Sequence, residues 1–300
     1  VQGVLAHASG VWTWTSRSPK AHHQAIVFMH GTQDPVVPYG QSVGGYEVFR
    51  KSGYPVVRLR SLEGWSHWPA EHNGPIPHAS QQMAWIEGMT SSDPVRLAEV
   101  FKTLGRARDK SQHDFAGFYQ VAMRIQGMKE MPEGAKKSAD RVIANVEALA
   151  SKHAAALAGV SRDVSLEKDD PAWIGHLPMF LRSFQGVPAA DSERKEWGET
   201  ITKQREAASE HLGAYYKAVR GSQKKEAFTA GMEAVNSAYL IASTSTYSFL
   251  NGMDELAAKA KEFGIDRAEA KRGATLLRNY RKALEEGKNE FEKINKRGSL

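Results

Sequence analysis

The sequence predicts an α/β segment with a mainly parallel sheet, followed by an all-α region. Two observations divide the 300-residue chain in this way. Residues 1–92 hold seven of the eleven His, five of the seven Trp and seven of the twelve Pro. Residues 93–300 are instead rich in Ala, Glu and Lys at helical spacing. We therefore expect a first domain at 1–92 and an all-α accessory domain at 93–300.

Three short segments of the first region are expected to be strands. Residues 1–8 (VQGVLAHA) and 25–30 (AIVFMH) are apolar without clean alternation, which is typical of parallel strands covered on both faces. The third segment, 55–61, alternates apolar residues with Arg58 and Arg60 after an opening proline. This pattern predicts an edge strand whose charges face outward. We expect the strand at 25–30 to lie between the other two.

Helices are expected to alternate with these strands. Residues 41–53 form a helical pattern that ends at a glycine, and 78–89 place Ala79, Met83 and Ile86 on one face. The order strand, strand, helix, strand, helix implies an α/β sheet.

Residues 93–300 are expected to form about six to eight helices, separated by segments that contain Pro or Gly. Asp93 is a suitable N-cap because Pro94 occupies the first helical position. No strand of consequence is expected between residues 95 and 295. His176 lies in an aromatic helical segment, and we expect it to be structural rather than functional.

Composition excludes several classes of protein. No run of eighteen apolar residues is present, so no membrane span is expected, and no secretion signal is visible. The absence of cysteine excludes disulfides, zinc–thiolate sites and thiol catalysis, but it leaves the compartment undetermined. The net charge of +6 is mild and interleaved, which argues against nucleic-acid binding. We expect no cofactor and no metal.

An acid and a histidine follow two of the expected strands. Asp34 comes just after the strand at 25–30, and His67 comes just after the strand at 55–61. The carboxyl ends of parallel strands meet at one rim of a sheet, where ligands bind. A histidine base needs a carboxylate that fixes its tautomer, and the two residues could serve as base and orienting acid. Alternatively, Asp34 caps a turn and His67 packs in a loop between tryptophans.

The segments "VFMHGTQDPVVP" and "GWSHWP" resemble the C-terminal part of the α/β-hydrolase fold. They are similar in particular to feruloyl esterases, polyhydroxybutyrate depolymerases and dienelactone hydrolases. In that family the acid lies in an HGxxDxxVP loop and the histidine in a GxxH loop after the last strand. The resemblance covers roughly residues 1–90, and it implies that Asp34 and His67 are the catalytic acid and base.

The resemblance also implies a serine nucleophile before the acid, on a G-x-S-x-G turn. The literal match "GQSVG" places Ser42 after Asp34, in an expected helix, and only Glu63 would remain as its acid. We therefore interpret Ser42 as a helix-surface residue that does not act as nucleophile. Ser9 lacks the first glycine of the motif.

The nucleophile is thus expected upstream of residue 1, in a missing N-terminal half of the hydrolase domain. The expected function is that of a serine esterase acting on a small or polymeric carboxylic ester through a Ser-Asp-His triad. Two alternatives remain open. One is a peptidase of the prolyl-oligopeptidase type, and the other is a non-catalytic helical interaction protein with a hydrolase-like remnant.

We expect the other histidines of the first region to have structural roles or to lie at the surface. His30 ends its strand and is expected to shape the acid loop. His22 and His23 lack the spacing of a metal site, and His72 and His78 are expected to face solvent.

Overall fold

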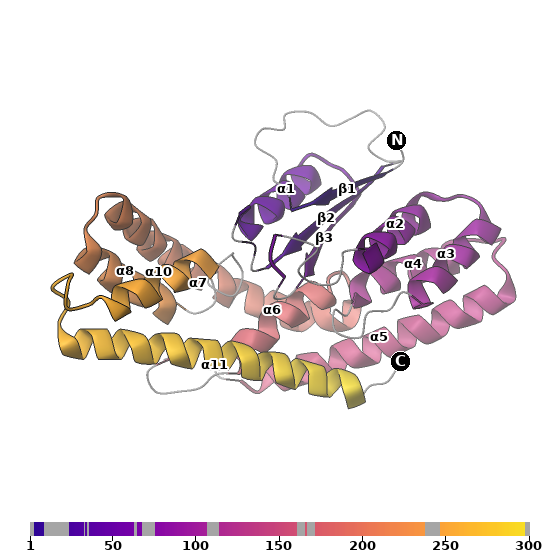
Figure 1. Cartoon of the computed structure of the whole chain (residues 1–300). Helices are drawn as coiled ribbons and strands as arrows, with labels where there is room; N and C mark the ends of the chain where they lie inside the picture. Colours follow the sequence, from indigo (N-terminus) through magenta and orange to yellow (C-terminus); the bar gives the residue numbers. More distant parts are fainter. Residues whose placement is uncertain are drawn as a thin grey trace. The chain divides into compact units, whose positions relative to one another are not determined.

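We describe a computed structural model of the chain, shown in Figure 1. The structure describes residues 3–8, 24–32, 34, 36–62, 65–67, 76–106, 114–160, 166, 172–237 and 247–297. Its elements, in chain order, are β1 (Gly3–His7), β2 (Ala25–Gly31), α1 (Tyr39–Lys51), β3 (Val56–Leu62), α2 (Ile76–Thr90), α3 (Pro94–Arg106), α4 (Phe115–Gly127), α5 (Glu133–Ala158), α6 (Trp173–Ser183), α7 (Pro188–Arg220), α8 (Lys224–Asn236), α10 (Tyr247–Ala258) and α11 (Arg267–Arg297).

The three strands form a parallel sheet in the order β1-β2-β3. The register places Val27 beside Leu5 of β1 and beside Arg58 of β3. The prediction that residues 25–30 form the middle strand is confirmed, and the strand extends to Gly31.

Different helices cover the two faces of β2. Ile26 and Phe28 pack with Phe49 of α1, whereas Ala25 and Val27 belong to a larger core that includes residues of α2, α3, α4 and α5. Figure 1 shows α1 on one side of the sheet and α2 on the other. Every residue of β2 is buried, which explains why its sequence shows no alternation.

The prediction that Arg58 and Arg60 of β3 face solvent is wrong, because the side chains of both arginines are buried. Arg58 donates to the carboxylate of Asp114, and its guanidinium carbon lies 4.9 Å from the ring centroid of Trp85. Nε of Arg60 lies 3.9 Å from the same carboxylate. A buried charge needs an opposite charge close by. Here that charge precedes α4, 56 residues after Arg58.

The buried face of α2 differs in part from the predicted one, although Ile86 is buried as expected. Met83 is 52% exposed, whereas His78, Gln82 and Trp85 are buried. The His78 ring packs edge-on against the ring of Trp65, with their centroids 4.7 Å apart. The expectation that His78 faces solvent is therefore wrong.

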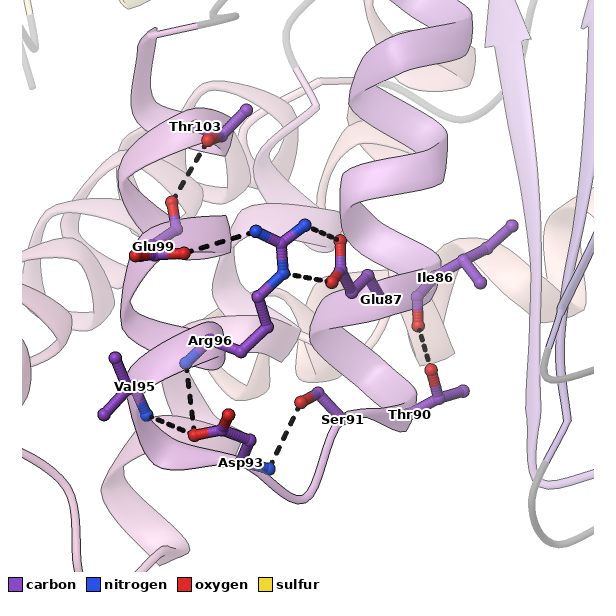
Figure 2. Close-up of polar contacts among 9 residues, drawn as sticks. All are labelled: Ile86, Glu87, Thr90, Ser91, Asp93, Val95, Arg96, Glu99 and Thr103. Atoms are coloured by element: carbon purple, nitrogen blue, oxygen red, sulfur yellow. Dashed lines mark hydrogen bonds and ion pairs between the residues drawn. The ribbon is translucent and has the colours of Figure 1, made fainter.

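The turn between α2 and α3 follows the predicted capping pattern. Oδ1 of Asp93 accepts hydrogen bonds from the backbone N–H groups of Val95 at 2.9 Å and Arg96 at 3.3 Å, which satisfies two free donors at the start of α3. The Asp93 N–H donates to Oγ of Ser91, and the Arg96 side chain pairs with Glu87 of α2 (Figure 2).

The chain divides into two compact units: Val1–Ala150 with Arg182–Ala189 and Leu300, and Ser151–Leu181 with Ala190–Ser299. Residues on both sides of position 92, such as Trp85 and Leu97, share one hydrophobic core in the first unit. The expected boundary at 92/93 thus marks a change in secondary structure inside a compact unit. As a domain boundary it stays a prediction.

The described part of the second unit contains helices joined by turns, and no strand occurs among the described residues from 95 to 295, as predicted. His176 is buried in α6, in line with the structural role expected for it. Nε2 of His176 lies 2.8 Å from Nδ1 of His153 in α5, and Nε2 of His153 lies 2.9 Å from Oδ1 of Asn295 in α11. In the portion of the chain that is described, no helix is both long and apolar enough to cross a membrane.

Candidate functional site

Asp34 and His67 meet at the carboxyl rim of the sheet. Asp34 follows β2 and His67 follows β3, and the two strands are parallel neighbours. Nδ1 of His67 lies 2.9 Å from Oδ2 of Asp34, within hydrogen-bond distance. The expected juxtaposition of the two side chains is therefore present.

The carboxylate of Asp34 is held by four donors. Oδ1 accepts the backbone N–H groups of Val36 and Val37, both at 2.8 Å. Oδ2 accepts from His67 and from Nε2 of His30, which lies 3.0 Å away. Asp34 itself is 1% exposed. A buried carboxylate saturated in this way has a fixed orientation.

These contacts also determine the charge of Asp34. Burial is the largest single influence on the pKa of this carboxyl and raises it, but the hydrogen bonds from Val37, His67 and Val36 together outweigh burial. The pKa of Asp34 therefore lies below its ordinary value, and the group is an anion near neutral pH.

Gly31 allows the histidine loop to lie against the end of β2. A Cβ atom at Gly31 would lie 2.3 Å from the carbonyl oxygen of Trp65 and 2.7 Å from that of Ser66. These are backbone atoms, so they could not move aside without displacing His67. The glycine of the "HG" dipeptide is thus required by the packing of the two loops that carry Asp34 and His67.

His67 has the features of an oriented base. Its side chain is 20% exposed, whereas that of His30 is fully buried. Because Nδ1 of His67 faces a carboxylate, the ring in its neutral form would carry its proton there and have Nε2 as its acceptor. A ring in this state can take a proton from a hydroxyl group.

Ser42 is buried, so the prediction that it lies on the surface of its helix is wrong. It is 0% exposed, and its Oγ lies 2.6 Å from Nδ1 of His30. Ser42, His30 and Asp34 therefore form a chain of the three residue types of a triad. That chain is closed off from solvent, because the side chains of His30 and Asp34 are fully buried as well. A substrate could not reach the hydroxyl of Ser42.

His7 is a residue near the site that sequence reasoning missed. It ends β1, beside Met29 of β2. Burial lowers the pKa of His7, and the charges that His30 and His67 can carry lower it further, against the opposing effect of Asp34. His7 could have been found from the sequence because it lies at the carboxyl end of an expected parallel strand. His30 occupies a similar position, one residue before the end of β2.

Several sequence-predicted positions lie outside the described residues, namely Ser9, His22, His23, Glu63 and His72. Within the described ranges, no group of three or more His, Asp or Glu side chains is arranged to hold a metal ion. Comparison with protein-family models, with curated proteins and with solved structures found no match to this chain.

Proposed function

We propose that the chain carries the acid and base of a serine hydrolase that cleaves carboxylic esters. The contact of 2.9 Å between Nδ1 of His67 and the buried Asp34 carboxylate supports this proposal most directly. In acyl transfer, the histidine takes the proton of the attacking hydroxyl, and the carboxylate stabilises the imidazolium that forms. The part-exposed ring of His67 suits this role, and the resemblance to esterases and depolymerases implies the same two residues.

The nucleophile in this proposal comes from outside the described residues. Ser42 is enclosed in the protein, and its hydroxyl is already directed at His30. In the described sheet, β1 is an end strand that pairs with β2 along one edge. We propose that a further strand of the hydrolase domain lies beside β1 and presents a serine at the same rim. The partner is thus an N-terminal half of the domain.

Hydrolysis of a short activated ester tests the proposal. The 300-residue chain alone should hydrolyse p-nitrophenyl acetate no faster than an unrelated control protein, whereas a longer chain that includes the N-terminal half should hydrolyse it readily. In the longer chain, Asp34→Ala and His67→Ala should each lower turnover by about a thousandfold or more, since triad members act as a unit. Asp140→Ala, at an exposed position of α5, is the matched control and should retain full turnover.

Three outcomes would contradict the proposal in different ways. Ser42-dependent turnover by the 300-residue chain would make "GQSVG" the nucleophile motif. Cleavage of proline-containing peptides in preference to esters would favour the peptidase alternative. A longer chain that hydrolyses neither substrate would favour the non-catalytic interaction protein.

A further inference from the structure

His30 lies between α1 and the acid loop, and both of its ring nitrogens are engaged. Nδ1 lies 2.6 Å from Oγ of Ser42. Nε2 lies 3.0 Å from Oδ2 of Asp34 and 2.9 Å from the backbone oxygen of Val37. The ring therefore connects a helix residue to both ends of the loop segment from Asp34 to Val37.

The partners of His30 determine its tautomer. The Val37 carbonyl and the ionised carboxylate can only accept hydrogen bonds, so Nε2 must carry a proton. Burial lowers the pKa of His30, although Val37 and Asp34 both raise it, so the ring is neutral near neutral pH. In a neutral ring with a proton on Nε2, Nδ1 is an acceptor, and Ser42 is the donor.

The same Asp34 oxygen serves two histidines. Oδ2 accepts from Nε2–H of His30 and from Nδ1–H of His67, while Oδ1 is held by the backbone. A rotation of the carboxylate that favoured one histidine would weaken the bond to the other. The orientation of Asp34 toward His67 is thus coupled to the proton position on His30.

We propose that His30 is a positioning residue for the Asp34–His67 pair, and that Ser42, as the donor to Nδ1, acts through His30 by holding its ring in place. A role for His30 in catalysis rests on the proposed function. Its role in orienting Asp34 and His67 does not. The proposal gives Ser42 a role in the site without making it a nucleophile. It also replaces the interpretation of Ser42 as a helix-surface residue.

Nuclear magnetic resonance of the 300-residue chain, labelled with ¹⁵N-histidine, tests the proposal without any need for activity. The wild-type protein should show His30 as a single neutral species with its proton on Nε2, and His67 with a downfield Nδ1–H resonance. Ser42→Ala should leave the proton of His30 on Nε2 but shift the Nδ1 resonance of His30, which loses its donor, and the Nδ1–H resonance of His67. Ser42→Thr, which keeps the hydroxyl, should restore both signals. Ser80→Ala, at an exposed position of α2, is the matched control and should change neither.

Substitution of His30 separates positioning from packing. His30→Gln can donate from its amide to Asp34 and Val37, so the His67 resonance should persist. His30→Leu fills the space without a donor, so the resonance should shift or disappear, although backbone amide spectra of β2 show the strand intact. In the longer chain with the N-terminal half, His30→Leu should lower kcat with little change in KM, and His30→Gln should recover much of the loss.

Two results would overturn the proposal. One is a proton on Nδ1 of His30 in the wild-type chain. The other is a His67 resonance that stays unchanged in both Ser42→Ala and His30→Leu while these variants remain folded. If the spectra follow the expectation and the longer chain shows no Asp34- and His67-dependent turnover, the proposed function fails and the positioning role stands as a structural one.

Discussion

At the scale of single residues, solvent exposure separates two histidines that contact the same oxygen. His30 and His67 both reach Oδ2 of Asp34, yet only the His67 side chain is part-exposed. A general base has to meet its substrate, so His67 is the one suited to proton transfer. The contact with Asp34 alone would not distinguish the two rings.

Burial of Ser42 leads to a prediction about covalent labelling. A fluorophosphonate reacts with hydroxyl groups that are both activated and accessible, and Ser42 is enclosed. The folded 300-residue chain should therefore carry no label on Ser42 after prolonged exposure, as read by mass spectrometry of its peptides. Stoichiometric labelling of Ser42 that disappears in Ser42→Ala would show that the helix opens to substrate.

Gly31 gives a second prediction at this scale. Gly31→Ala places Cβ against the carbonyl oxygens of Trp65 and Ser66, so the histidine loop must move. We expect a loss of about 1–3 kcal/mol in the free energy of unfolding, together with loss of the downfield His67 resonance. Gly44→Ala in α1 is the control, because no atom lies within 4 Å of a Cβ at Gly44. It should raise stability by up to about 1 kcal/mol, since alanine favours a helix over glycine.

Sequence reasoning could predict the juxtaposition of Asp34 and His67, because the rule that relates strand ends in a parallel sheet is local and topological. It could not predict the tautomer of His30 or the burial of Ser42. Those depend on how α1 packs on β2, and α1 is a helix whose glycines and polar residues show no strong apolar face. A serine in such a helix looks exposed until the packing partner is known.

At the scale of elements, a buried ion pair joins β3 to the start of α4. Asp114 caps α4 by accepting the N–H of Gly117 at 3.1 Å, and it also pairs with Arg58. Burial is the largest influence on the pKa of Asp114 and raises it, but Arg58 and Arg60 outweigh burial and hold the pKa well below its usual range. The carboxylate therefore stabilises the fold above its unfolded pKa, and this contribution declines as the pH falls below that value.

Removal of this charge should be costly. Asp114→Asn leaves the guanidinium of Arg58 buried without its counter-charge, and we expect a loss of about 3–5 kcal/mol in the free energy of unfolding. Urea denaturation followed by tryptophan fluorescence, to which Trp85 beside Arg58 contributes, measures this loss. Asp140→Asn on the exposed face of α5 should change stability by less than about 0.5 kcal/mol. Arg58→Met should recover part of the loss in the double variant, and a purely additive double variant would contradict the pairing.

Residues that the apolar pattern does not reveal explain why β3 and part of α2 were predicted incorrectly. The alternating arginines of β3 indicated a solvent-facing side of the strand. Their partner Asp114 lies 56 residues after Arg58, so the pattern within 55–61 could not reveal it. In α2, Ile86 is buried as predicted, but Met83 is exposed and the buried face includes His78 and Gln82, so the apolar residues alone did not locate that face. By contrast, the start of α3 was predicted correctly, because Asp93 caps it through neighbouring residues.

At the scale of the whole molecule, each compact unit has its own buried polar network. The first contains Asp34 with its two histidines, and Asp114 with its arginines. The second contains the chain from His176 through His153 to Asn295, where α6 and α11 approach closely. A Cβ atom at Gly175 would lie 2.2 Å from the carbonyl oxygen of Leu284, so glycine is required at that approach. The two units should therefore respond differently to acid.

The histidine network of the second unit leads to a prediction about pH. Burial lowers the pKa of His176 to about 4, from 6.5 for the free side chain. Between these two values the unfolded chain binds a proton that the folded unit does not, so the contribution to stability is complete above pH 6.5 and is lost as the pH falls to about 4. The shift corresponds to a loss of at most about 3 kcal/mol.

Hydrogen exchange resolved along the chain measures this loss. On acidification through that window, amide protection in α6 and α11 should fall more than protection in β2 and α2. Burial also lowers the pKa of His7 and of His30, so the first unit should lose some protection in the same direction. The carboxylates Asp34 and Asp114, whose pKa values are depressed, keep their charge over most of this range. His176→Gln, which has no titrating ring at that position, should abolish most of the difference in lost amide protection between the units. His211→Gln on α7 is the control and should preserve that difference. An equal loss of protection in both units of the wild-type chain, or a His176→Gln chain with the wild-type pH dependence, would show that this buried histidine does not control the acid response of the second unit.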